Sequence, residues 1–184
     1  MRVFIAFPIV KEVCWELERL QKKFKRINQN VLVTWVNPKA MHVTLQFLGD
    51  LAEEKIEKVK QILQKIVPRY QKFSYWLDGL DAFPNKFNPN IIVAKIREEG
   101  QTSFLLQKGI ANELRQIGIV GDDQPWRQHV TIGRNKLGDE VVGFGEIEVK
   151  KIEWEVREVE LIESELSAEG SIYTTLGLYQ LNHG

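Results

Sequence analysis

A short pattern, His-Val-Thr, occurs twice in the sequence, at 42–44 and at 129–131. Alternate side chains of an extended strand point to the same face, so each copy presents an imidazole and a hydroxyl side by side. An imidazole titrates near about pH 6.5, so one of a pair can accept a proton while the other donates one. Threonine hydroxyls can bind non-bridging phosphate oxygens. The pattern therefore predicts acid-base displacement at phosphorus by His42 and His129, with Thr44 and Thr131 binding the phosphate.

A lone histidine on a strand is usually a hydrogen-bonded structural residue, and this is the simpler interpretation of either copy by itself. Repetition favours catalysis, because two of the three histidines have the same neighbours. The third, His183, lies at the C-terminal tip, where we expect a solvated tail residue. Zinc sites usually show a second ligand at short spacing and phosphate-binding loops are rich in glycine, and neither pattern occurs here. We therefore expect no metal and no cofactor.

Length and composition indicate one domain spanning residues 1–184. The chain is 43% hydrophobic, which is enough for a single well-filled core. Basic and acidic residues balance at 25 each, so only a local basic pocket, not an overall field, is available to hold nucleic acid. Cys14 is the only cysteine, which excludes an internal disulfide and fits a reducing compartment. No apolar run has membrane-spanning length, so we expect a soluble, cytoplasmic monomer without membrane association.

The elements that position the first motif are predicted from hydrophobic periodicity. Val13, Leu17 and Leu20 recur at the spacing of an amphipathic helix, and Ile56, Val59 and Leu63 repeat this spacing. Apolar and β-branched runs bounded by turn residues predict the strands. The expected order is strand 2–7, helix 11–28, strand 31–36, strand 42–49 and helix 53–67, after which the first half closes.

The second half shows the same kinds of segments. Its expected order is strand 73–83, a turn at 84–90, strand 91–96, a helix through 105–117, a polar loop at 121–128, a strand from 129, and β-rich runs at 146–154, 156–165 and 172–181. Gly118 is a natural helix stop. The order is not a simple alternation of single strands and helices, which disfavours a doubly wound parallel sheet. We expect an α+β fold whose two halves are related by duplication, with no linker between them.

Four blocks of the sequence resemble the two-histidine phosphoesterase superfamily, and within it the RNA 2′,3′-cyclic phosphodiesterase family, also called 2′-5′ RNA ligases. They are RVFIAF from Arg2, WVNPKAMHVTLQFLGD from Trp35, PWRQHVTIGR from Pro125, and the tail from Val159 to Leu181. The resemblance implies a bilobal α+β fold with two antiparallel sheets around a central cleft and helices outside. It also implies one histidine motif from each lobe and no cofactor.

The resemblance implies distinct roles for the two histidines. His42 would donate a proton to the departing 3′ oxygen of an RNA 2′,3′-cyclic phosphate, and His129 would accept one from water. The product would be a 2′-phosphomonoester, and the reverse reaction would join RNA ends through a 2′-5′ linkage. RNA 3′ ends that bear the cyclic phosphate are thus the implied partner.

Arg134 matches an arginine of the family and would bind phosphate through its donor fork, the alternative being a surface ion pair. Strict alternation from His129 turns Arg134 to the far face, so its role requires a bulge, for which Gly133 is suited. The equivalent position after the first motif is Phe47, which makes the two halves chemically unequal.

Other positions bear on how RNA is held. Thr34, Gln128 and the strand at 91–96 depart from the family pattern, which affects contacts beyond the terminal phosphate. Phe4, Trp35 and Trp126 are candidates for stacking on the terminal base, with core packing as the alternative for each. Two other functions use the same site: a cyclic phosphodiesterase acting on a small nucleotide, and an RNA-end binding module without turnover.

Overall fold

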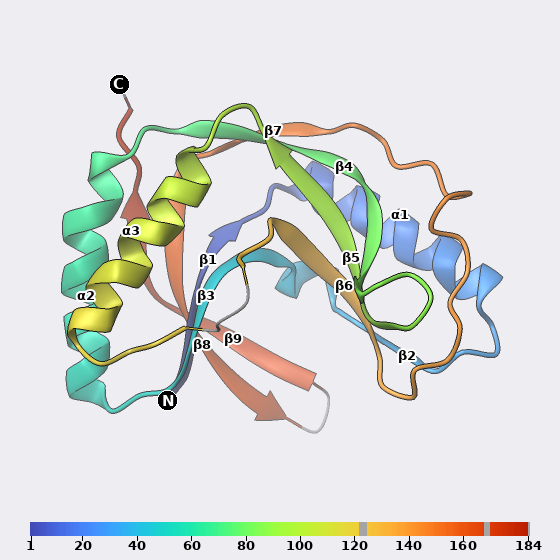
Figure 1. Cartoon of the computed structure of the whole chain (residues 1–184), viewed down its shortest axis with the longest axis horizontal. Helices are drawn as coiled ribbons and strands as arrows, with labels where there is room; N and C mark the ends of the chain where they lie inside the picture. The colour runs from blue at the N-terminus through green and yellow to red at the C-terminus, as the bar shows by residue number, and fades with distance from the viewer. Residues whose placement is uncertain (122–124, 168–169, 184) are drawn as a thin grey trace.

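The computed structural model describes residues 1–121, 125–167 and 170–183. Part of the predicted polar loop, residues 122–124, lies outside this range. The described chain forms two antiparallel sheets with three α-helices on their outer sides (Figure 1). This is the predicted α+β architecture. No helix of the described residues is long and apolar enough to cross a membrane.

The four-stranded sheet contains the first motif. Its strand order is β3 (His42–Asp50), β1 (Arg2–Pro8), β8 (Glu158–Ser167) and β9 (Gly170–Gln180). Helices α2 (Glu53–Ile66) and α3 (Thr102–Gln116) lie side by side along this half of the molecule (Figure 1). The short helix η2 (Val67–Arg69) continues α2. Gly118 follows α3 with a φ of 74°, which is the helix stop that the sequence predicted.

The five-stranded sheet contains the second motif. Its strand order is β2 (Val33–Trp35), β6 (His129–Asn135), β5 (Pro89–Glu98), β4 (Phe73–Pro84) and β7 (Glu153–Val156). Helix α1 (Lys11–Ile27) covers its outer side, and the short helix η1 (Pro38–Ala40) precedes β3. Gln21 fixes α1 there, because its Nε2 donates to the carbonyls of Val36 at 2.7 Å and Ile132 at 2.8 Å.

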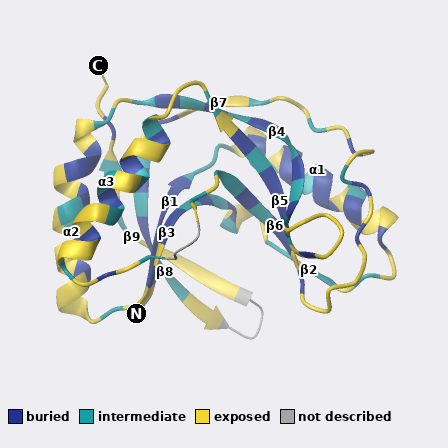
Figure 2. Cartoon of the chain, viewed as in Figure 1, coloured by how far each residue is buried: buried dark blue, intermediate teal, exposed yellow. Residues whose placement is uncertain are grey.

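The two sheets exchange elements between the halves of the chain. The connection to each histidine strand from its neighbour contains one α-helix: α1 between β1 and β3, where β2 and η1 also intervene, and α3 between β5 and β6. Yet α1 contacts β6 and α3 contacts β3, so each helix packs in the opposite lobe. Strands of the two halves also pair: β2 pairs with β6, and β8 pairs with β1 and carries β9 at the edge of the same sheet. The expectation that the first half closes on itself was wrong, and one continuous cluster of buried residues runs through both lobes (Figure 2).

The β-rich run expected at 146–154 was also largely wrong, since only β7 forms there and residues 136–152 are mostly irregular. Side chains of α1 and its C-cap form hydrogen bonds with the backbone of this segment, where a neighbouring strand would otherwise do so. Asn28 donates to the carbonyl of Val142 at 3.0 Å and accepts from its N–H at 2.9 Å. Glu16 accepts the N–H of Lys150 at 2.9 Å. These bonds satisfy backbone groups that a sheet would otherwise satisfy.

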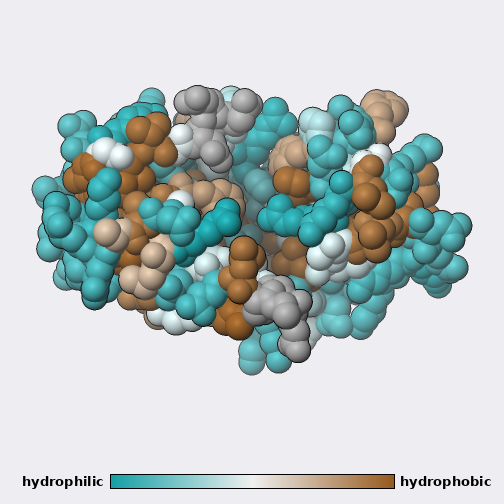
Figure 3. Space-filling view, turned by 90° about the horizontal axis from the view of Figure 1, so that it is seen from below, coloured by the Kyte–Doolittle hydropathy of each residue, from teal (hydrophilic) through white to brown (hydrophobic). Residues whose placement is uncertain are grey.

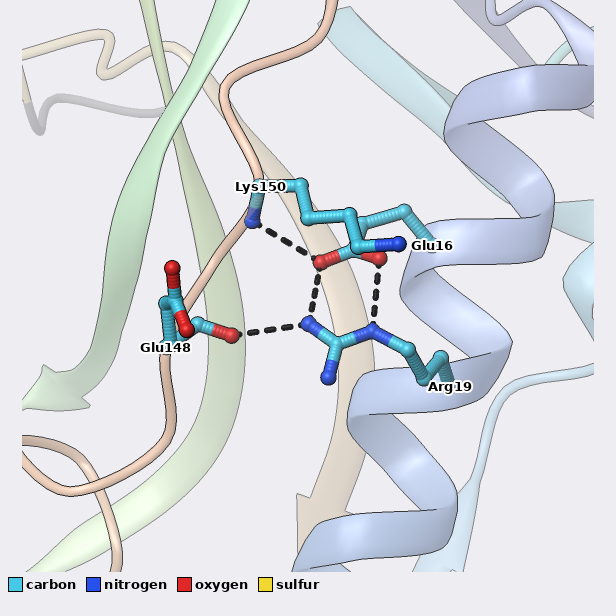
Figure 4. Close-up of polar contacts among 4 residues, drawn as sticks. All are labelled: Glu16, Arg19, Glu148 and Lys150. Carbon is cyan, nitrogen blue, oxygen red and sulfur yellow. Dashed lines mark hydrogen bonds and ion pairs between the residues drawn. The ribbon is translucent and has the colours of Figure 1, made fainter.

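Glu16 is the centre of this attachment (Figure 4). Its carboxylate is almost fully buried and accepts two bonds from the Arg19 guanidinium, at 2.7 and 2.5 Å. Arg19 in turn donates to the carbonyl of Glu148 at 2.8 Å. Burial alone raises the pKa of Glu16, but the hydrogen bonds from Arg19 and from Lys150 outweigh it, so the pKa is lowered. The charged carboxylate therefore stabilises the attachment of residues 148–150 to α1.

Replacing Glu16 with Gln should lower the free energy of unfolding by about 1–3 kcal/mol at pH 7, since a charge-assisted bond network is lost in a buried position. Because the folded pKa of Glu16 is lowered, its contribution is present above the ordinary pKa of 4.5 and is lost as the pH falls further. Urea unfolding of both proteins should therefore converge at low pH. Glu18→Gln, on the exposed side of α1, is the control and should change little. Equal effects of the two substitutions would contradict the role given to Glu16.

Candidate active site

The two motif strands have the same pattern of burial. In β3, His42 and Thr44 are half-buried while Val43 and Leu45 are buried. The seven residues of β6 repeat the order of buried, half-buried and exposed positions found in the first seven residues of β3. Each histidine thus shares a face with its threonine, and the valines fill the core, as alternation predicted.

A β-bulge follows each motif. In β6, Ile92 pairs with Gly133 and Val93 pairs with Thr131, which leaves Ile132 as the extra residue. β3 has a corresponding register shift after Thr44. The shift reverses the alternation, so Ile132 and Gly133 both turn to the core and the exposed Arg134 returns to the face of His129. The bulge that Arg134 requires is therefore present.

Glycine is required at position 133 by close contact with β2. A Cβ there would lie 2.9 Å from the Val33 side chain and 3.2 Å from the ring of Trp35. Any larger residue would push β2 away from the bulge. Gly133 thus permits the local geometry that turns Arg134 toward the histidines.

Both imidazoles are held in the same way. Nδ1 of His42 lies 2.8 Å from the carbonyl of Ala40, and Nδ1 of His129 lies 2.7 Å from the carbonyl of Arg127. A carbonyl only accepts, so Nδ1 carries the hydrogen in each ring and donates it. This leaves Nε2 of each ring for chemistry, as an acceptor when the ring is neutral and as a donor when it is charged.

The site disfavours protonation of both rings. Burial lowers the pKa of His42 to about 4, against the opposing effect of its bond to Ala40, and the nearby charges of His129 and Arg134 lower it further. Burial also lowers the pKa of His129, and Arg134 adds to the effect. Because β3 contacts β6, the two motifs lie near each other in the fold, although 87 residues separate the histidines in sequence. Both imidazoles are neutral at pH 7 in the free protein, and a bound anion favours their protonation.

Aromatic rings surround His42 on the four-stranded sheet. Phe4 lies 4.7 Å from the His42 ring and Tyr173 lies 5.4 Å from it, measured between centroids. Phe4 is only 3% exposed, so its ring packs against the buried side of the imidazole. Tyr173 and Phe47 are 36% and 53% exposed. The position of Tyr173 beside His42 was not predicted from the sequence, because it depends on the pairing of β9 with β8 in the folded sheet.

The two tryptophan candidates have structural contacts. Trp35 packs against Phe24 at 6.2 Å and shares the core side of the sheet with Gly133, opposite His129. This is the core packing that was the alternative to base stacking. Trp126 donates its indole N–H to the carbonyl of Thr44 at 2.8 Å. Trp126, three residues before His129, thereby links the chain entering the second motif to β3, the strand of the first motif.

The chain entering β6 is anchored at the start of α3. Gln128 donates from Nε2 to the Ser103 hydroxyl at 2.6 Å and to Glu98 at 3.3 Å. Ser103 donates its hydroxyl to Glu98 at 2.5 Å. Gln128, which departs from the family pattern and directly precedes His129, is thus held against the start of α3. Among the described residues, no three His, Cys, Asp or Glu side chains are grouped as metal ligands would be.

Comparisons with known proteins show the family of the chain. The sequence profile described as LigT like phosphoesterase matches residues 7–93, which include the first motif. A protein of Aquifex aeolicus named RNA 2′,3′-cyclic phosphodiesterase is 31% identical, covering 98% of this chain and 97% of its own length. The chain belongs to the LigT-like phosphoesterase family. The family resemblance found in the sequence is thereby confirmed.

Other LigT-like relatives extend the agreement over the whole chain. A Thermus thermophilus protein of the same name is 30% identical and covers 100% of this chain and 93% of its own length. A solved Thermus thermophilus structure superposes with a TM-score of 0.82 at 27% identity, covering 100% of this chain and 99% of that one. Crystalline Escherichia coli LigT in complex with 3′-AMP, at 18% identity and a TM-score of 0.79, shares the fold. The bilobal fold predicted for this LigT-like protein is confirmed.

Proposed function

We propose that the protein hydrolyses RNA 2′,3′-cyclic phosphate ends to 2′-phosphomonoesters. The observation that carries the proposal is the pair of imidazoles whose Nδ1 atoms are fixed by backbone carbonyls, with Arg134 on the His129 face of β6. The proposal is supported by relatives of 27–31% identity that carry the name RNA 2′,3′-cyclic phosphodiesterase. Two imidazoles with free Nε2 atoms supply the acid and the base that an in-line displacement needs.

Nε2 of His129 accepts a proton from water as the water oxygen attacks phosphorus. The bond from phosphorus to the 3′ oxygen breaks, and Nε2 of His42 donates a proton to that oxygen. The products are a 2′-phosphate and a free 3′-hydroxyl, and the two histidines have exchanged protonation states. Thr44, Thr131 and Arg134 bind the non-bridging oxygens, where negative charge develops. The same displacement, with an RNA 5′-hydroxyl in place of water, gives a 2′-5′ linkage.

The RNA that bears the cyclic phosphate lies on the His42 side in this mechanism, since its ribose carries the leaving oxygen. Phe47 and Tyr173 are the exposed rings on that side and are suited to stack on the terminal base. Phe4 lies beneath them, against His42. Its role is to support the imidazole and the two exposed rings.

The pH dependence of kcat/KM should be displaced to acid pH. Catalysis needs one protonated and one neutral imidazole, and burial lowers the pKa of both, that of His42 to about 4. The singly protonated pair therefore accumulates only below the ordinary histidine pKa of 6.5 and disappears near pH 4. Bound phosphate favours protonation, so the alkaline limb of kcat should lie at higher pH than that of kcat/KM. Coincident alkaline limbs near pH 8 would contradict this electrostatic description.

The function is tested with an RNA that ends in a 2′,3′-cyclic phosphate, incubated in a metal chelator. We expect turnover and a 2′-phosphate product, separated by chromatography from the 3′-phosphate standard. A 3′-phosphate product would contradict the assignment of the leaving oxygen. Binding without turnover would instead favour an RNA-end binding module, and faster turnover of a cyclic mononucleotide than of the RNA would favour a small substrate.

A further inference from the structure

A cavity lies on the His129 side of the site, away from the aromatic rings around His42. It has a volume of about 170 Å³ and extends from His129 across β5 and β4. Strand register places its lining on the catalytic face, because Lys95 pairs with His129 and Val93 pairs with Thr131. Asp81 pairs with Val93 and therefore shares this face. The cavity is thus a continuation of the catalytic surface.

The volume of this cavity exceeds what the attacking water needs. A water molecule occupies about 30 Å³ in the liquid. In an in-line displacement the nucleophile and the leaving oxygen lie on opposite sides of phosphorus. With the RNA that leaves on the His42 side, whatever is attached to the nucleophile must lie beside His129. The cavity occupies that position.

The lining groups match a ribonucleotide in chemistry. Arg97 donates from Nε to Asp78 at 2.7 Å, and Lys95 lies 3.8 Å from the same carboxylate. Arg127 lies over the ring of Phe83 at 5.6 Å, and that ring meets His129 edge-on at 5.0 Å. Lys95 and Arg97 suit a phosphate group in exchange for Asp78, the Asp81 carboxylate can accept from a sugar hydroxyl, and the planes of Phe83 and Arg127 suit a base.

Lys95 lies over Gly79 at the wall of the cavity. A Cβ at position 79 would make an ordinary contact with the Lys95 Cε at 3.4 Å, but φ there is 134°, so a side chain would strain the backbone. The lysine and Arg97 are 41% and 65% exposed, so both can reach an anion at the edge of the cavity.

We propose that this cavity binds the first nucleotide of a second RNA, presenting its 5′-hydroxyl to His129 and its 3′-phosphate to Lys95 and Arg97. The inference rests on the proposed function. Nε2 of His129 takes the proton of the 5′-hydroxyl, the new P–O5′ bond forms, the P–O3′ bond breaks, and His42 protonates O3′. The product is a 2′-5′ diester with a free 3′-hydroxyl, and no co-reactant is needed. The cavity thus determines how the cyclic phosphate divides between joining and hydrolysis.

The test measures the ratio of joined to hydrolysed product, using a cyclic-phosphate RNA and a 5′-hydroxyl dinucleotide acceptor. The combined variant Lys95→Gln/Arg97→Gln should lower this ratio at least tenfold at subsaturating acceptor. Lys108→Gln, an exposed cation on α3, is the matched control and should leave it unchanged. The wild type should join a nucleoside acceptor, which lacks the 3′-phosphate, less well than the dinucleotide. The variant should join both acceptors equally poorly.

The remaining outcomes separate this inference from the function on which it rests. Hydrolysis without any joining in the wild type would overturn the acceptor site and leave the phosphodiesterase intact. An unchanged ratio in the double variant would also overturn it. A parallel loss of hydrolysis with a long RNA, but not with a cyclic mononucleotide, would show that Lys95 and Arg97 hold the donor strand. Absence of hydrolysis in every assay would instead reject the proposed function.

Discussion

Substituting His42 or His129 with alanine should each lower kcat at least about a thousandfold on a cyclic-phosphate RNA. General acid or base catalysis contributes on the order of 10²–10⁴, and loss of one partner also leaves the other in the wrong protonation state. His183→Ala is the matched control, since this histidine is exposed in the C-terminal tail, and should retain wild-type activity. The double variant should be little worse than either single one, because the two rings act as a unit.

A substrate with sulfur in place of the bridging 3′ oxygen distinguishes the two roles. A thiolate leaves without a proton, so this substrate should restore much of the activity of His42→Ala and little of that of His129→Ala. The comparison is informative because the environment of the free site lowers the pKa of His42, the proposed donor, to about 4. Equal rescue of both variants, or rescue of His129→Ala alone, would require the roles to be exchanged. Full activity in either alanine variant would remove the mechanism.

Arg134→Gln should lower kcat about a hundredfold, the usual order for losing one donor to a developing anion. It should also move the alkaline limb of kcat/KM to higher pH. Burial is the main cause of the lowered pKa of both His42 and His129, and the Arg134 cation adds to it. Removing the cation raises both pKa values, so the singly protonated pair persists to higher pH.

Arg134→Lys separates charge from geometry. Lysine keeps the cation and should leave the alkaline limb in place, but it lacks the planar fork and should still lose activity. Lys136→Gln is the control for a cation nearby on the chain, beyond the end of β6. A pH dependence that is the same in all variants would show that Arg134 does not act on the histidines.

The central β-bulge is as important to this site as the motif itself. In a regular strand, the sixth residue counted from His129 would face the core, and Arg134 occupies that position. The extra residue in β6 turns it to the catalytic face. The first motif has the same bulge but carries Phe47 at the corresponding position. The same kind of β-bulge thus places a cation, Arg134, on the side of His129 and an aromatic ring, Phe47, on the side of His42.

The sequence by itself determined the local features. Periodicity predicted the helices and most strands, because burial of one face repeats every 3.6 or 2 residues regardless of partners. Alternation placed each histidine beside its threonine, and the requirement for a bulge next to Gly133 followed from the same rule. Residue types predicted acid-base displacement at phosphorus, whereas the separate roles of His42 and His129 and the role of Arg134 came from the family resemblance.

Only the tertiary structure decided which elements pair. Sheet partners are chosen by contacts between residues far apart in sequence, so neither the exchange of helices between lobes nor the position of Tyr173 could be predicted from a local pattern. The run at 146–154 resembles a strand in composition, but Lys150 within it bonds to Glu16 instead. The acceptor cavity requires three strands in register, and the lowered histidine pKa values require burial, both of which exist only once the two lobes share one core.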